Sequence, residues 1–109
     1  MLVAYEVSLE VAQNLRPFID RVAKFDNTQA KQMRDAMSSA VRNLAEGAVH
    51  SGGNKRLKYE IALGEVNEVK AALDLAICWG YITNDEAVRV PLRRLLALCY
   101  GLTRPKPGR

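Results

Sequence analysis

The sequence predicts an all-α protein, folded as one antiparallel up-down-up-down four-helix bundle that assembles as a ring. Apolar residues recur every three or four positions in four successive segments, the period of an amphipathic helix. Hydrophobic residues make up 49% of the 109-residue chain, whereas aromatic residues make up only 6%. The core is therefore aliphatic, which suits close helix packing. Short connections between the segments favour antiparallel neighbours.

The first helix is expected over residues 2–24. Pro17 lies inside it and cannot donate a hydrogen bond to the carbonyl of Gln13, so a kink or a break is expected there. A short turn follows, in which Asp26, Asn27 or Thr28 can cap the next helix. The apolar stripe of this helix consists of Val3, Val7, Val11, Leu15, Phe18 and Val22.

The second helix is expected over residues 29–46 and has the cleanest amphipathic pattern. Gly47 is the predicted stop, because glycine adopts the left-handed conformation at low cost. Residues 50–54 contain a Gly-Gly pair and are the predicted loop. The apolar stripe consists of Met33, Ala36, Met37, Ala40, Val41 and Leu44.

The third helix is expected over residues 55–79 and would span roughly 40 Å. Gly80 is its predicted stop, and Trp79 is expected to anchor the following turn. Its apolar stripe is broad enough to serve both the core and a partner subunit. The stripe contains Tyr59, Leu63, Val66, Leu73 and Ile77, widened by Ile61, Val69, Ala72 and Ala76.

The fourth helix is expected to begin at Thr83, where Thr83 and Glu86 fit a capping box. Pro91 predicts a kink, and Gly101 predicts the end. Residues 1–103 thus form the bundle, and residues 104–109 form a basic flexible tail. The apolar stripe consists of Val88, Leu92, Leu95, Leu96, Cys99 and Leu102.

Several classes of function are disfavoured. No apolar run approaches the ~20 residues of a membrane helix, and the N-terminus does not resemble a signal peptide, so a cytoplasmic protein without a membrane partner is expected. Cys78 and Cys99 are expected to be reduced and buried. His50 is the sole histidine, and Glu65 and Glu68 lack a matching Glu-x-x-His motif. We therefore expect no metal, no cofactor, no catalytic residue and no enzymatic activity.

The basic residues give the best functional hint, with a formal charge of +4 and a pI of about 9.3. Three of them follow the Gly-Gly pair at a helix N-terminus, where free amides and the helix dipole favour phosphate. Arg93 and Arg94 lie on the fourth helix near Arg89, and Arg104 lies in the tail. Aromatic residues are scattered, so contacts to phosphates are expected rather than base stacking. Solvated helix faces are the alternative interpretation. The candidate nucleic-acid-binding residues are Lys55, Arg56, Lys58, Arg93, Arg94 and Arg104.

Three segments carry a resemblance to a known family: residues 43–47 (Asn-Leu-Ala-Glu-Gly), residues 61–65 (Ile-Ala-Leu-Gly-Glu) and residues 79–82 (Trp-Gly-Tyr-Ile). The chain resembles the four-helix proteins encoded within 23S rRNA intervening sequences. The accessory variability determinant of diversity-generating retroelements belongs to the same family. The resemblance implies a homopentamer, and that accessory protein binds nucleic acid and a reverse transcriptase. It also implies a structural signature formed by Asn43, Glu46, Gly47 and Gly64.

The expected function is a non-catalytic homo-oligomeric accessory protein that binds RNA or DNA phosphates through a basic surface, with a reverse transcriptase as a further candidate partner. The alternative is an oligomeric scaffold that binds another protein. An enzyme of unknown class is the third and weakest hypothesis.

Overall fold

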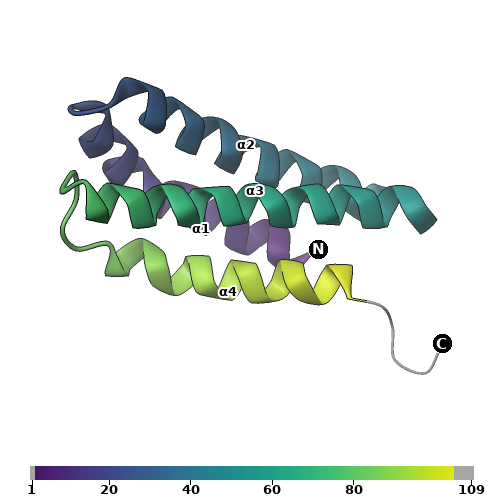
Figure 1. Cartoon of the computed structure of the whole chain (residues 1–109). Helices are drawn as coiled ribbons and strands as arrows, with labels where there is room; N and C mark the ends of the chain where they lie inside the picture. Colours follow the sequence, from purple (N-terminus) through teal and green to yellow (C-terminus); the bar gives the residue numbers. More distant parts are fainter. Residues whose placement is uncertain (1, 105–109) are drawn as a thin grey trace.

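The chain forms four antiparallel helices, and the computed structural model describes residues 2–104 (Figure 1). They are α1 (Val3–Ala23), α2 (Asn27–Val49), α3 (Gly52–Cys78) and α4 (Glu86–Thr103). Each helix packs against its neighbours in the sequence, and α4 packs back against α1. The predicted all-α up-down bundle is therefore confirmed. Its extents are 47 × 21 × 21 Å.

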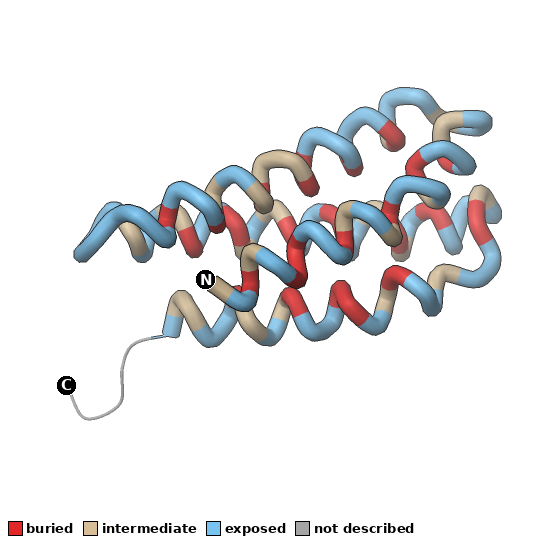
Figure 2. The backbone as a smooth tube through the Cα atoms, turned by 180° about the vertical axis from the view of Figure 1, so that it is seen from behind, coloured by how far each residue is buried: buried red, intermediate tan, exposed pale blue. Residues whose placement is uncertain are grey.

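The core runs along the bundle axis between the inward faces of the helices (Figure 2). The predicted stripes of α2 and α4 supply most of their buried residues, with Val41, Leu96 and Leu102 at the margin. Ala30, Gly47 and Pro91 are buried as well. In α1, Ile19 is buried where Phe18 was expected, and Val3 is exposed. In α3, Ile77 is exposed, and the buried side chains are Tyr59, Ala62, Val66, Val69, Leu73 and Ala76.

Two helix ends are formed as predicted. The Asp26 carboxylate caps α2 by accepting a hydrogen bond from the Gln29 amide at 3.0 Å. At the end of α3, Gly80 has a φ of +77°, its amide donates to Ile77, and the Tyr81 amide donates to the Ala76 carbonyl at 2.8 Å. This pair of bonds is a Schellman motif, which satisfies the last carbonyls of the helix.

The start of α4 differs from the prediction. The helix begins at Glu86 with Asp85 at the cap position, so no capping box forms at Thr83. The Ile82 amide still bonds back to Ala76 at 3.4 Å, which shows that the chain is leaving α3 at this point. The Asn84 side chain instead accepts a hydrogen bond from the Glu86 amide at 3.1 Å.

Other predicted boundaries also move. Because α3 begins at Gly52, the predicted loop of residues 50–54 shrinks to residues 50 and 51. Pro17 does not break α1, and α4 passes Gly101 to end at Thr103. Arg104, the first residue of the predicted tail, follows α4, and residues 105–109 lie outside the described part of the chain.

The turn between α3 and α4 is anchored by different residues from the one predicted. Trp79 is 66% exposed, and the buried side chain of this turn is Ile82. The Tyr81 ring stacks on Phe25, with ring centroids 5.1 Å apart. Cys78 is exposed as well, although it was expected to be buried, whereas Cys99 lies in the core. Cys78 falls on the outer side of α3 because the helical period carries it away from the buried stripe.

Gly47 has a packing role and does not end the helix, because α2 continues to Val49. It is buried against α3. A Cβ atom at this position would lie 2.6 Å from Cε1 and 2.9 Å from Cδ1 of Tyr59. These separations are shorter than van der Waals contact, so the close approach of the two helices requires a residue without a side chain. Among residues 2–104, no helix is long and apolar enough to span a membrane.

Replacing Gly47 with Ala should therefore destabilise the bundle. We expect the free energy of unfolding to fall by about 1–3 kcal/mol through overpacking against Tyr59. Gly101→Ala is the matched control, because a Cβ at Gly101 in α4 would have no described atom within 4 Å beyond its chain neighbours and the backbone of its own helix. It should raise the free energy by up to about 1 kcal/mol through helix propensity. Urea unfolding followed by circular dichroism measures both, and effects of the same sign would contradict the packing role.

Candidate functional site

The α2–α3 hairpin extends past the start of α1 and the end of α4 (Figure 1). Its tip carries Lys55, Arg56 and Lys58 in the first turns of α3. We call these three residues the basic tip. The side chain of Ser51, at the cap position, makes no capping hydrogen bond, so it does not occupy the amides of the first turn. The basic tip therefore combines three cations with the positive end of a helix dipole.

Three of the six predicted nucleic-acid-binding residues form ion pairs with carboxylates of the same chain. The Lys58 ammonium lies 2.7 Å from Glu46, Arg56 lies 3.5 Å from Glu60, and Arg93 lies 3.3 Å from Glu86. These pairs are at the surface, where an ion pair contributes about 0–1 kcal/mol, so a phosphate can replace the carboxylate.

The other three candidate residues form no ion pair within residues 2–104. The Lys55 ammonium lies 6.0 Å from the centroid of the Tyr59 ring. Arg94 and Arg104 form no ion pair with any residue in the range 2–104. Arg93 and Arg94 point about 100° apart, because they are consecutive in a helix. The structure thus brings together the basic tip, but it does not extend it into one surface with Arg93 and Arg94.

The four signature residues lie along α2 and α3, and three of them make defined contacts. Glu46 forms an ion pair with Lys58, whose ammonium donates a hydrogen bond to the Glu46 carboxylate. This hydrogen bond is the main reason that the pKa of Glu46 is lowered. Gly47 admits Tyr59, and the Asn43 side chain donates to the Ser39 carbonyl at 2.9 Å. Gly64 is exposed, and a Cβ at this position would touch nothing in residues 2–104 beyond its chain neighbours and the backbone of its own helix.

Arg89 holds α3 and α4 together and does not belong to the basic surface. Its guanidinium forms ion pairs with Asp85 and, at 2.7 Å, with Asp74 of α3. Partial burial pushes the pKa of Asp74 up, but hydrogen bonds from Lys70 and Arg89 outweigh it and hold the pKa below its usual value. The sequence grouped Arg89 with Arg93 and Arg94, but only a tertiary structure could reveal the Asp74 contact.

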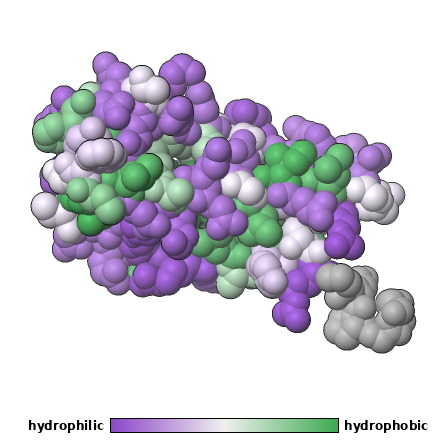
Figure 3. All heavy atoms as spheres, in the orientation of Figure 1, coloured by the Kyte–Doolittle hydropathy of each residue, from purple (hydrophilic) through white to green (hydrophobic). Residues whose placement is uncertain are grey.

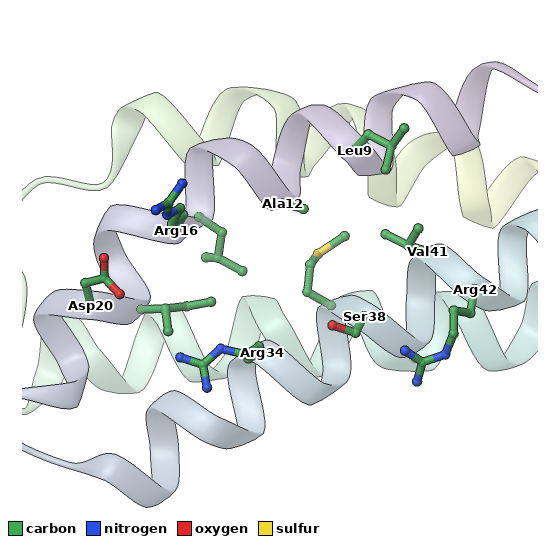
Figure 4. A pocket seen from close by; sticks show the side chains of 11 residues that line it. Leu9, Ala12, Arg16, Asp20, Arg34, Ser38, Val41 and Arg42 are labelled. Atoms are coloured by element: carbon green, nitrogen blue, oxygen red, sulfur yellow. The ribbon is translucent and has the colours of Figure 1, made fainter.

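A groove between α1 and α2, with a volume of about 550 Å³, was not predicted (Figure 4). We call it the basic groove, because Arg16 of α1 and Arg34 and Arg42 of α2 border it together with Asp20. None of these arginines forms an ion pair within the described residues. The sequence feature that could have predicted this groove is the position of Arg34 and Arg42, eight residues apart, beside the apolar stripe of α2. The apolar lining consists of Leu9, Ala12, Leu15, Ile19, Met37 and Val41.

On the other side of α2, a groove of about 610 Å³ lies between α2 and α3. Asp35, Glu65 and Glu68 line it, and Arg42 borders this groove as well. A hydrogen bond from Glu65, together with its charge, raises the pKa of Glu68. Neither glutamate forms an ion pair with a cation in residues 2–104. In the same range, no three His, Cys, Asp or Glu side chains cluster as metal ligands.

The outer face of α3 carries apolar side chains that the single chain leaves uncovered. Leu57, Ile61 and Leu75 are 53%, 39% and 49% exposed. With Gly64 and Ala71 they recur mainly at intervals of three and four residues, the spacing of a helix-packing seam. We call these five residues the outer stripe. Figure 3 shows hydrophobic surface on the face where α3 lies.

These features define a small four-helix bundle protein with a basic tip, two grooves beside α2 and an exposed apolar stripe on α3. The family model described as "23S rRNA-intervening sequence protein" matches residues 2–93. The chain belongs to this family, which confirms the resemblance to the proteins encoded within 23S rRNA intervening sequences.

A solved structure has a similar fold. It is the crystal structure of a protein of unknown function from the S23 ribosomal protein family of Bacteroides thetaiotaomicron VPI-5482. The two share 23% sequence identity with a TM-score of 0.83, over 94% of this chain and 99% of that chain. At this identity the likeness shows the fold. No curated protein matches the chain.

Replacing Arg89 with Ala should destabilise the bundle more than removing Arg94, an arginine of the same helix that forms no ion pair among the described residues. The Asp85 side chain, only 14% exposed, would lose its partner, so we expect a loss of about 2 kcal/mol at pH 7. Arg94→Ala, the control, should change the free energy of unfolding by less than about 0.5 kcal/mol.

The Arg89 effect should also depend on pH. The pKa of Asp74 is lowered in the folded state, so its contribution is full above the unfolded value of 3.8 and is lost as pH falls through the folded value. The difference between wild type and Arg89→Ala should therefore shrink between about pH 5 and pH 2. Urea titrations across this range measure it, and a difference that is constant with pH would contradict the ion-pair account.

Proposed function

We propose that this chain is a non-catalytic, homo-oligomeric accessory protein that binds nucleic-acid phosphates through its basic tip. The outer stripe of α3 is the observation that carries the proposal. α3 carries apolar residues on an inner and an outer arc, yet a single copy covers only the inner arc. A second copy can cover the outer stripe and remove this apolar area from water.

A closed ring of five copies is the assembly that we propose, since the family resemblance implies it. In a ring whose axis runs along the helices, every basic tip lies at the same end. The three cations of each basic tip then gather at that end, and the formal charge of +4 per copy makes the whole ring strongly positive. Such a field attracts RNA or DNA through phosphates, with little selectivity for sequence.

The basic groove favours a second candidate function, an oligomeric scaffold for another protein. An apolar floor, bordered by arginines that pair with no carboxylate of residues 2–104, is suited to an acidic amphipathic segment. If a reverse transcriptase gene neighbours the gene for this chain, that enzyme is the proposed partner. A position within an rRNA gene would favour the intervening-sequence branch of the family.

Replacing Ile61 with Glu should split the assembly without unfolding the helices, because Ile61 belongs to the outer stripe. Val69→Glu should instead unfold the protein, since Val69 is fully buried within one copy. Val90→Glu is the matched control, because Val90 is 58% exposed on α4 and lies outside the stripe. Light scattering at micromolar concentration should give a multiple of 12.1 kDa for wild type and Val90→Glu, and 12.1 kDa for Ile61→Glu. A wild-type mass of 12.1 kDa would reject the proposed oligomer.

Changing Lys55, Arg56 and Lys58 together to Ala should weaken binding to RNA and DNA of any sequence about equally. The slope of log affinity against log salt should also become shallower, because each neutralised phosphate on a duplex contributes about −0.9. The control replaces Arg21, Lys24 and Lys31 with Ala, which removes the same charge from the opposite end of the bundle (Figure 1).

Fluorescence anisotropy with labelled oligonucleotides, from ~50 mM salt upward, measures both effects. Absence of binding to RNA and to DNA by wild type at ~50 mM salt would reject the nucleic-acid proposal. Equal losses in the two triple variants would show that only net charge matters and that the basic tip is an ordinary solvated surface.

A further inference from the structure

We propose that the outer stripe of α3 from one copy docks into the basic groove of the next copy, with Glu68 facing Arg34. This inference rests on the proposed oligomer and names its two contacting faces. Because both faces flank α2, the same geometry places α2 along the central channel of the ring.

The two faces complement each other chemically. The basic groove has an aliphatic floor and arginines that no carboxylate in the described chain pairs with. The outer stripe is aliphatic and is accompanied by Glu65 and Glu68, which lie three residues apart on α3 and pair with no cation within residues 2–104. Each face therefore lacks the charges that the other offers, and docking would pair them while covering both apolar surfaces.

The heights of the charged residues along the bundle agree with this pairing. Two contacts set the register of α2 against α3: the Gln29 side chain donates to the Ala72 carbonyl, and Lys58 binds Glu46. Arg34 lies five residues after Gln29, and Glu68 lies four residues before Ala72, so the two are almost level. Rotation about an axis parallel to the helices leaves heights unchanged. Glu68 of one copy can therefore meet Arg34 of the next.

The directions of the two faces favour a closed ring. Rings need two different faces on each subunit, set at about 90° for four copies and about 108° for five. The basic groove lies between α1 and α2, and the outer stripe borders the groove between α2 and α3. Adjacent sides of a four-helix bundle differ by about a quarter turn, which suits a ring of four or five copies.

The shape of the outer stripe also suits insertion into a groove. Its two inner positions are Gly64 and Ala71, which project little beyond the backbone, whereas Leu57, Ile61 and Leu75 project further. Beyond the chain neighbours and the backbone of α3 itself, no described atom lies within 4 Å of a Cβ at Gly64. Small residues at the centre of a helix contact allow the partner backbone to come close.

Charge reversal tests the pairing directly. Arg34→Glu and Glu68→Arg should each reduce the mass from the wild-type multiple to 12.1 kDa at micromolar concentration, with the circular dichroism unchanged. The double variant Arg34→Glu, Glu68→Arg should regain the wild-type mass, because the two charges are exchanged across the contact. Arg21→Glu and Glu10→Arg, which are exposed on α1 outside the groove, are the controls and should keep the wild-type mass.

The outcomes separate the two proposals. An oligomeric wild type whose mass survives either single reversal would overturn the docking of these faces and leave the proposed oligomer standing. Failure of the double variant to recover would overturn the Arg34–Glu68 pairing. A wild-type mass of 12.1 kDa would overturn the oligomer and the docking together.

A disulfide scan tests whether the contact joins different faces. Ser38 borders the basic groove nine residues after Gln29, and Gly64 lies eight residues before Ala72, so they are level. Ser38→Cys with Gly64→Cys is made in a Cys78→Ser background. Cys99 should stay inert, because burial raises the pKa of its thiol to about 11.

Mild oxidation should join each copy to both neighbours, giving a covalent ladder that ends at the full ring on a denaturing gel. The variants with only one of the two new cysteines should give no ladder. Covalent dimers alone from the double-cysteine variant would indicate a two-fold contact and would overturn the ring geometry.

Discussion

The close packing of α2 against α3 is the constraint on which the rest of the structure depends. These two helices make the most extensive contact in the bundle. Small residues on α2, including Ala36, Ala40 and Gly47, let α3 approach closely, and Tyr59 fills the space that Gly47 leaves. The Lys58–Glu46 and Gln29–Ala72 contacts fix the register along this interface. The hairpin can therefore project past α1 and α4 and carry the basic tip.

The same packing explains why α3 differs from the other helices. Its inner face is fully used by α2 and α4, so the outer stripe has no partner within the described chain. A single copy leaves this apolar surface in water beside two like-charged glutamates, which is an unfavourable arrangement for an isolated bundle. Association of copies would relieve both costs at once. Stability of the fold and assembly are thus linked through one helix.

Much of the fold could be predicted from the sequence, because the 3.6-residue period determines which face of α2 and of α4 is buried. The period was less informative for α3, where two apolar arcs compete and only packing shows that Val69 lies inside and Ile61 outside. Helix ends were predicted less well. Glycine often ends helices, so the sequence predicts a stop at Gly47, whereas the structure needs this glycine for the close contact with Tyr59.

The candidate site was predicted only in part, since charges depend on tertiary contacts. The basic tip is local in sequence, so its residues were recognised together. The sequence groups Arg89 with Arg93 and Arg94, although Asp74, fifteen residues earlier, binds Arg89 at 2.7 Å. The basic groove went unpredicted because Arg16 and Arg34 come from different helices. Half of the predicted cations prove to be paired within the chain, so phosphate binding at the basic tip must compete with Glu46 and Glu60.

Solvent accessibility of the Ile61 methyl groups tests most directly whether the outer stripe is covered in the native assembly. A soluble paramagnetic agent broadens methyl NMR signals in proportion to their exposure, and Val90 on α4 provides the internal reference. If copies associate through the outer stripe, Ile61 signals should be protected at high protein concentration while Val90 signals are broadened. Equal broadening of Ile61 and Val90 at every concentration would contradict the proposed assembly.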